Sequence, residues 1–281
     1  MKRPLIRVAL GAGAIAGLVI SATTAVASTA GSKSSTLYSS LVSPLPGNLP
    51  SQPFQAQQTS EFGNLIRLTK AGHLTSVVVT MSSWGCQNGG GTTCVTTPGA
   101  TFPVSITLNL YRQPVSAIPW VPTSSPVLPG APILADTKTF NIPYRPSASA
   151  KCTGSTAGDW FDGKQGCFSG EAVNITFSVD HDVPQTLVFG IVYNTSQYGP
   201  SPNSCDLVPF ANCPVDSLNV GLSTKAPSKG SDPYPGTAFW NTQTATDYCD
   251  GGAAGANIFR LDSPGFPCWT PYSAAVQFVG T

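Results

Sequence analysis

Apolar and polar residues alternate in short runs along most of the chain after residue 60. The clearest run is Val104–Tyr111, in which the four even-numbered residues are aliphatic and the odd-numbered ones are Ser, Thr, Asn and Tyr. A period of two predicts a β-strand with one buried face. Runs of this kind predict strands at 61–68, 76–84, 104–111, 132–142, 173–179, 186–193, 218–222, 257–261 and 275–279, with a shorter strand at 238–240.

The segments between these runs are rich in turn-forming residues, and the chain contains 28 glycines and 26 prolines. No run has a convincing helical period. No repeat of fixed length recurs, which argues against a β-propeller or a solenoid. Nine or ten short strands separated by turns therefore predict an all-β fold, an antiparallel two-sheet β-sandwich of the jelly-roll type.

The N-terminal residues have the parts of a secretion signal. Three basic residues precede an uncharged apolar run at 8–20, and Ala25-Val26-Ala27 is a small-residue cleavage site. Cleavage is expected after Ala27 or Ala30. The alternative is an uncleaved anchor, but Ser and Thr interrupt the ~20 apolar residues that a spanning helix needs. We therefore expect a signal peptide at 1–27, an extended Ser/Pro/Gln-rich linker at 28–60 and one secreted β-sandwich domain at 61–281.

Eight cysteines are arranged in four pairs that are close in sequence: Cys86 with Cys94, Cys152 with Cys167, Cys205 with Cys213, and Cys249 with Cys268. In an exported protein an even number of cysteines predicts disulfides. Sequential pairing closes the shortest loops, although eight cysteines allow many other connectivities. Metal ligation and thiol redox chemistry are the alternatives. They are disfavoured because no pair has C-x-x-C spacing and the two histidines do not complete a zinc-finger pattern.

Charge is scarce, since only 10% of the residues are charged. Removal of the signal leaves 11 of the 14 Lys and Arg against 13 Asp and Glu, a net charge of about −2. Without a basic cluster the chain has no electrostatic footprint for nucleic acid or for an anionic membrane. The apolar content of 41% instead fits a packed core.

Few side chains are available for catalysis. The chain has two glutamates, Glu61 and Glu171, and it lacks the serine-hydrolase elbow, the nucleotide-binding loops and the zinc-protease motif. A carboxylate pair for glycoside hydrolysis would draw on the aspartates at five positions, Asp159, Asp162, Asp180, Asp182 and Asp250. The sequence favours a non-catalytic protein, with a secreted polysaccharide-acting enzyme, a glycoside hydrolase or lyase, as the alternative.

Calcium is the metal that the sequence leaves open. Asp180 and Asp182 follow a predicted strand, and Asp159 and Asp162 lie within the segment between Cys152 and Cys167. Turn carboxylates of this kind hold structural Ca²⁺ in extracellular proteins, although solvated turn residues explain them equally well. The spacing is not that of an EF-hand. A structural calcium site at these four aspartates is therefore a hypothesis, and no other cofactor is expected.

Three tryptophans in turn-like contexts give the best argument for binding. Trp120, Trp160 and Trp269 are flanked by Pro, Asp, Asn or Tyr, and an exposed ring beside hydrogen-bonding groups can stack on a sugar. The alternative is that these rings cap the ends of the sandwich, while Trp84 and Trp240 at strand ends are expected in the core. We expect a secreted extracellular or cell-surface protein that binds a polysaccharide or surface glycan, or else a purely structural extracellular protein.

Six segments of the sequence carry a resemblance to other proteins: PLPGNLPS (44–51), TSEFGN (59–64), VVVTMSSW (77–84), VYNT (192–195), DSLNVGL (216–222) and FWNT (239–242). Through these segments the sequence resembles an uncharacterised family of secreted, β-rich bacterial proteins that is frequent in actinobacteria. The resemblance spans nearly the whole mature chain and implies export and a single β-rich domain. It implies no catalytic residue, because the family has no established activity. Family members extend into a surface-anchoring tail where this chain ends, so release from the cell is expected.

Overall fold

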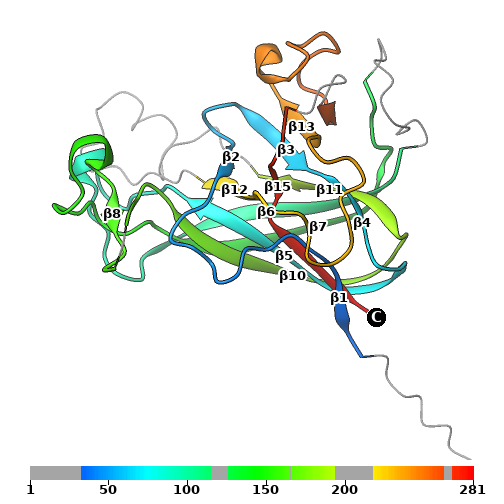
Figure 1. Ribbon diagram of the computed structural model, residues 1–281, viewed down its shortest axis with the longest axis horizontal. Coiled ribbons are helices and arrows are strands. Elements are labelled where there is room, and N and C mark those ends of the chain that lie inside the picture. The colour runs from blue at the N-terminus through cyan, green and yellow to red at the C-terminus, as the bar shows by residue number, and fades with distance from the viewer. Residues whose placement is uncertain (1–32, 115–125, 165, 194–217, 263–267) are drawn as a thin grey trace, which may run out of the picture. The chain divides into compact units, whose positions relative to one another are not determined.

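The computed structural model describes residues 33–114, 126–164, 166–193, 218–262 and 268–281. Within them the chain forms two seven-stranded antiparallel sheets and a two-stranded ribbon (Figure 1). Sheet A consists of β1 (Ser35–Ser39), β2 (Ser51–Pro53), β5 (Gly72–Ser83), β10 (Glu171–Val183), β12 (Leu218–Ser223), β15 (Ser273–Ala274) and β16 (Val276–Gly280). Sheet B consists of β3 (Thr59–Gly63), β4 (Leu65–Arg67), β6 (Thr101–Arg112), β7 (Pro132–Pro143), β11 (Thr186–Val192), β13 (Ala238–Thr242) and β14 (Arg260–Asp262). The ribbon pairs β8 (Trp160–Phe161) with β9 (Cys167–Phe168).

Helical structure in the described ranges is limited to three single turns of 3-10 helix, η1 (Gly91–Thr93), η2 (Gly154–Thr156) and η3 (Ala245–Asp247). The same ranges contain no helix with the length and apolar character needed to cross a membrane.

The chain crosses repeatedly between the two sheets. It leaves sheet A after β2, forms β3 and β4 in sheet B, returns with β5, and crosses again to β6 and β7. The crossings continue to β15 and β16 in sheet A. Two packed antiparallel sheets joined in this way form a sandwich with jelly-roll character, so the predicted fold class is confirmed.

The hydrophobic core lies between the inner faces of the sheets. Val77, Val79 and Met81 of β5 are completely buried, and the alternating apolar residues of β6 face them from sheet B. Phe189 of β11 and Phe278 of β16 meet across the core with ring centroids 5.6 Å apart. Burial of one such side chain is worth about 1.5–3 kcal/mol, so the alternation seen in the sequence is also the main source of stability.

Each of the ten predicted runs overlaps a strand of the structure, although 257–261 shares only its last two residues with β14 and one run is interrupted. The run at 61–68 is divided at Asn64 into β3 and β4. The buried Asn64 side chain donates to the carbonyl of Thr237 (2.9 Å) and accepts from the amide of Ala274 (3.2 Å). The side chain of Asn64 thus links this position to two other segments, while its backbone carbonyl still accepts from the amide of Phe189 in β11 (3.1 Å).

The linker expected at 28–60 is wrong for its described part. Residues 35–39 form β1, which pairs with β16, and residues 51–53 form β2, which pairs with β12. Leu37, Tyr38 and Phe54 are buried in the core. The compact domain therefore begins at Lys33 rather than at Glu61. The signal peptide lies outside the described residues and stays a prediction.

Lys138 joins the two edge strands on one side of the sandwich. It lies on β7, an edge of sheet B, and its Nζ donates to the carbonyl of Ser178 on β10, an edge of sheet A (2.8 Å). It also pairs with Asp136 (3.2 Å) and lies near the ring of Phe177. A charge that points inward from an edge strand discourages pairing with a second chain.

Three of the four predicted disulfides are confirmed, and they are Cys86–Cys94, Cys152–Cys167 and Cys249–Cys268. The fourth expected bridge, between Cys205 and Cys213, is not among them. Cys205 and Cys213 both belong to the segment 194–217, which lies outside the described residues. The pairing of Cys205 with Cys213 therefore stays a prediction.

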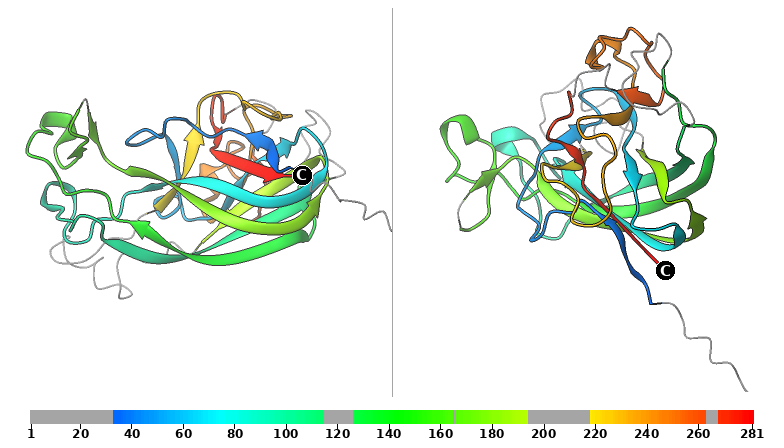
Figure 2. Two further views of the ribbon diagram at one scale, coloured as in Figure 1. Left: turned by 90° about the horizontal axis from the view of Figure 1, so that it is seen from below. Right: turned by 45° about the vertical axis from the view of Figure 1, so that its right-hand side comes forward.

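The confirmed bridges lie in two places. The first two lie together in a lobe at one end of the sandwich, around β8, while the third lies in the segment beside β13 (Figures 1 and 2). In the lobe, the buried Arg145 donates to the carbonyls of Gly158 (3.0 Å) and Gly91 (3.4 Å). Arg145 therefore connects the loop closed by Cys86–Cys94 to the loop closed by Cys152–Cys167.

Candidate functional site

Trp84 is the most exposed tryptophan among the described residues. It follows directly on the end of β5, and 39% of the residue is accessible to solvent. Its indole N–H donates to the hydroxyl of Ser82 (3.1 Å), which is completely buried. With its only polar atom held by the protein, the ring presents hydrocarbon to solvent from a fixed position. The expectation that Trp84 lies in the core is wrong.

A chain of hydrogen bonds continues from Trp84 to the half-buried side chain of Asn48. The hydroxyl of Ser82 donates to Oδ1 of Asn48 (2.7 Å). The side-chain oxygen of Asn219 accepts from Ser51 Oγ (3.1 Å) and Trp84 Nε1 (3.2 Å). The side-chain nitrogen of Asn219 donates to the carbonyl of Leu218 (3.1 Å). Asn48 is half-buried, and its side-chain nitrogen has no acceptor among the described residues.

Gly170 packs closely against this chain of hydrogen bonds. A Cβ atom at Gly170 would lie 2.7 Å from Ser82 Oγ, 2.9 Å from Trp84 Nε1 and 3.0 Å from Asn48 Oδ1. The three polar atoms therefore surround one small space that only glycine leaves free. The carbonyl of Gly170 also accepts from the indole N–H of Trp160 (2.8 Å), which fixes the glycine from the other side.

The three tryptophans predicted to bind a ligand have different positions. Trp160 is only 8% exposed, and its ring packs on Phe168 with centroids 5.4 Å apart. Trp269 is half-buried against the rings of Phe62 (5.2 Å) and Trp240 (5.3 Å). Both rings thus pack against other aromatic rings of the domain, and a role in binding stays a prediction for them. Trp240 is buried as expected, and Trp120 lies outside the described residues.

The four aspartates of the calcium hypothesis form two separate pairs. Asp180 and Asp182 lie near the end of β10 and bind the ring of His73, with Asp180 2.8 Å from Nε2 and Asp182 2.9 Å from Nδ1. Asp159 and Asp162 belong to the lobe, before the start of β10. Strand β10 alone spans roughly 40 Å at about 3.3 Å per residue, so the two pairs do not meet.

The two aspartates of the lobe accept hydrogen bonds from neighbouring residues. Asp159 accepts from the hydroxyl of Ser169 (3.0 Å), and Asp162 accepts from the backbone amides of Lys164 (2.8 Å) and Gly166 (3.1 Å). His73 lies near the start of β5. The hydrogen bond with Asp182 is the main cause that raises the pKa of His73. The four aspartates do not form one cluster, and calcium binding stays a prediction.

The two glutamates also lie apart, because Glu61 is in sheet B and Glu171 in sheet A. Burial raises the pKa of Glu61, although Oε1 accepts from Asn109 (3.0 Å) and Tyr111 (2.7 Å). Asn241 lies directly opposite Glu61 in the β13–β3 ladder, and its buried Oδ1 has no hydrogen-bond partner. The two glutamates therefore do not form a carboxylate pair with each other.

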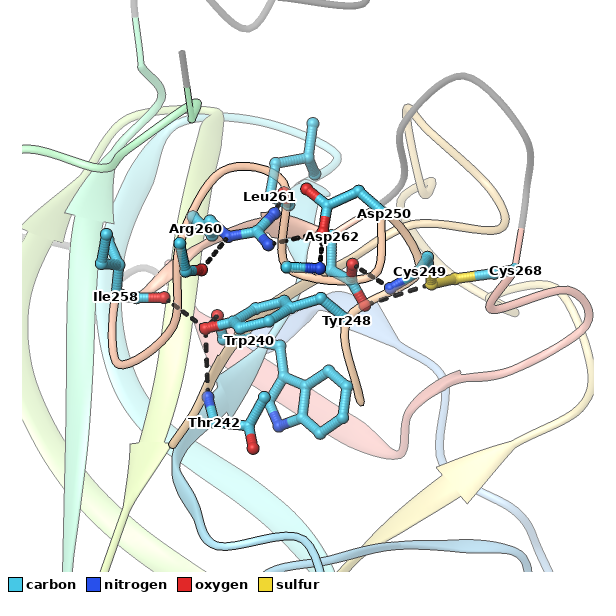
Figure 3. A network of polar contacts seen from close by, with 12 residues as sticks. Trp240, Thr242, Tyr248, Cys249, Asp250, Ile258, Arg260, Leu261, Asp262 and Cys268 are labelled. Carbon is cyan, nitrogen blue, oxygen red and sulfur yellow. Dashed lines mark hydrogen bonds and ion pairs between the residues drawn. A yellow bond between two sulfur atoms is a disulfide. The ribbon is translucent and has the colours of Figure 1, made fainter. Parts of the chain in front are cut away.

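A dense polar network surrounds the third disulfide (Figure 3). The buried side chain of Arg260 pairs with Asp250 (2.8 Å), and its guanidinium lies 3.7 Å from the centre of the Tyr248 ring. Although burial opposes its ionisation, hydrogen bonds from Arg260 and the Gly252 amide lower the pKa of Asp250. The neighbouring Asp262 is completely buried and accepts from the Cys249 amide (2.9 Å) and the Trp269 indole (2.9 Å).

Within the described part of the chain, the only close group of three metal-ligand types is Cys249, Asp262 and Cys268. Its two sulfurs are bonded to each other, so they are not thiolate ligands. Comparison with known protein families, with curated proteins and with solved structures finds no match for the chain. The function is therefore inferred from the geometry of the chain itself.

Proposed function

We propose that the protein is a non-catalytic extracellular carbohydrate-binding module whose primary contact is the ring of Trp84. The observation that carries this proposal is the exposed, anchored indole beside an Asn48 amide that lacks a protein acceptor among the described residues. A sugar has an apolar C–H face and hydroxyl groups around its rim. An aromatic ring with a nearby hydrogen-bond donor is complementary to both.

The surroundings of Trp84 favour a rigid site. Ser82 is completely buried, and Asn219 is 7% exposed. Side chains that are already ordered lose little conformational entropy when a ligand binds, which increases affinity. The low overall charge of the chain agrees with a neutral ligand, because a charged polymer would require opposite charge at the site.

The first experiment measures depletion of the purified mature protein from solution by insoluble and arrayed polysaccharides, together with the release of reducing sugar. Saturable depletion without sugar release is expected. Trp84→Ala should weaken the binding about tenfold or more, as for a central aromatic contact. Tyr272→Ala is the matched control, because Tyr272 is 37% exposed and lies beside β15, and this variant should bind like the unaltered protein.

Each other outcome contradicts part of the proposal. Release of reducing sugar would replace it with the polysaccharide-acting enzyme. Equal loss of binding in both variants would show that Trp84 is not the contact. An absence of depletion on every glycan would exclude carbohydrate binding and leave the purely structural role.

A further inference from the structure

The three described disulfides differ in how accessible their sulfur-bearing residues are. Cys86 and Cys94 are each 2% exposed, and Cys152 is 5% exposed with a half-buried partner in Cys167. Cys268, in contrast, is exposed, while its partner Cys249 is half-buried. Thiol–disulfide exchange begins when a thiolate reaches one sulfur in line with the bond, so access decides which bond reacts.

A buried carboxyl group lies next to the less accessible sulfur. Oδ2 of Asp262 is 3.2 Å from Sγ of Cys249, and Oδ1 accepts from the backbone amide of the same cysteine. Figure 3 shows the Asp262 side chain directed at Cys249, with Cys268 at the far end of the disulfide. Neither of the two lobe disulfides has a carboxyl group within hydrogen-bond distance of a sulfur among the described residues.

We propose that Cys249–Cys268 is a thiol-exchange site, in which an external thiol attacks the exposed Cys268 and Asp262 exchanges a proton with Cys249. In the first step a thiolate forms a bond to Sγ of Cys268, and the bond between Cys268 and Cys249 breaks. The electron pair leaves on Sγ of Cys249, which takes a proton from the protonated Asp262. A second external thiol then releases Cys268 and leaves as the oxidised disulfide of the two reductant sulfurs.

The charges around Asp262 support its role as a proton donor. Burial raises the pKa of Asp262 to about 6, although the Cys249 amide and the Trp269 indole favour the carboxylate. Arg260 lowers this pKa further and Asp250 raises it, while Tyr248 lies between Arg260 and the core. A group that is half protonated near pH 6 can both give and accept a proton in the mildly acidic range.

The first test exposes the folded protein to glutathione, blocks free thiols at intervals, and follows each disulfide by peptide mass spectrometry. Cys249–Cys268 should be reduced at least about tenfold faster than Cys86–Cys94 and Cys152–Cys167. The rate relative to Cys152–Cys167 should rise as the pH falls below about 6, because protonated Asp262 then becomes available. Taking the ratio within one sample removes the ionisation of glutathione itself.

The variant Asp262→Asn separates proton transfer from a loss of packing. At pH 5 its Cys249–Cys268 bond should be reduced several-fold more slowly than in the unaltered protein. At pH 8 the difference should vanish or reverse, because the Asp262 carboxylate repels the departing Cys249 thiolate. Equal rates for all three disulfides, or a ratio between the two proteins that is the same at both pH values, would overturn the proposal. If the variant does not fold, the pH dependence within the unaltered protein decides the question.

Discussion

Two regions of the domain are each centred on a buried arginine and a disulfide, but their electrostatics differ. In the lobe, Arg145 donates to two backbone carbonyls, and burial lowers its pKa despite the nearby charge of Asp159. Beside β13, Arg260 pairs with the Asp250 carboxylate and stacks on the Tyr248 ring. The lobe is therefore held largely by neutral acceptors, whereas the second region depends on ionised groups and should respond to pH.

The largest expected effect comes from removing the arginine in each region. Arg260→Met leaves Asp250 without its cation in a nearly buried place and should lower the free energy of unfolding by about 4 kcal/mol. Arg145→Met leaves the Gly158 carbonyl without its donor, whereas the Gly91 carbonyl keeps the amide of Cys94, so about 2 kcal/mol is expected. Urea denaturation measures both. Similar losses would contradict the contrast between the regions, and Arg112→Met at an exposed position is the control.

The second expected effect is a dependence of stability on pH. Burial raises the pKa of Asp262 and of Asp232 to about 6 from the ordinary 3.8. The folded state then binds protons more tightly than the unfolded state between these values, so stability should fall as the pH rises from about 4 to about 6. The decrease is on the order of 2 kcal/mol for each group.

Thermal unfolding between about pH 4 and pH 7 measures this dependence. Glu61 and His73 act in the same direction, because their pKa values are also raised, and Asp250 acts in the opposite direction at lower pH. Asp262→Asn should remove about half of the decrease caused by the two aspartates. A melting temperature that rises with pH over this range would show that these carboxyl groups are not neutral in the folded protein.

The smallest change in stability is expected from a substitution at Gly170, and the main measurement for this variant is glycan binding at the Trp84 site. Gly170→Ala places a methyl group among Ser82, Trp84 and Asn48 and should cost about 1 kcal/mol while weakening glycan binding. Gly130→Ala is the control, because a Cβ there meets nothing within 4 Å and the backbone is not left-handed. If the Gly170 variant binds glycan as well as the unaltered protein, the hydrogen bonds among Ser82, Trp84 and Asn48 do not contribute to the binding site.

Alternation predicted most of the strands because each of them buries one face in the core, which leaves a period of two within the strand itself. It was less informative for β1 and β2, which have only five and three residues and which become strands through pairing with β16 and β12. Such pairing joins residues more than 150 positions apart, which no local pattern records. The boundary of the domain was misplaced for this reason.

The candidate site could have been placed partly from the same alternation. In β5 the odd positions Val77, Val79 and Met81 face the core, so Trp84 falls on the opposite face with Thr80 and Ser82. Its parity therefore indicated a position outside the core, but not exposure to solvent, because Thr80 and Ser82 are themselves completely buried. The partners Asn48 and Asn219 come from distant segments, and no spacing in the sequence brings them to Trp84.

The most direct test of the central claim is a double-mutant cycle between Trp84 and Asn48 on a glycan that the protein binds. Trp84→Ala removes the ring, and Asn48→Asp removes the free N–H donors while keeping Oδ1 for Ser82. If one sugar contacts both groups, the loss in the double variant should be smaller than the sum of the two single losses, by at least about 0.5 kcal/mol. Full additivity, or single variants that bind as well as the unaltered protein, would contradict a shared binding site at Trp84.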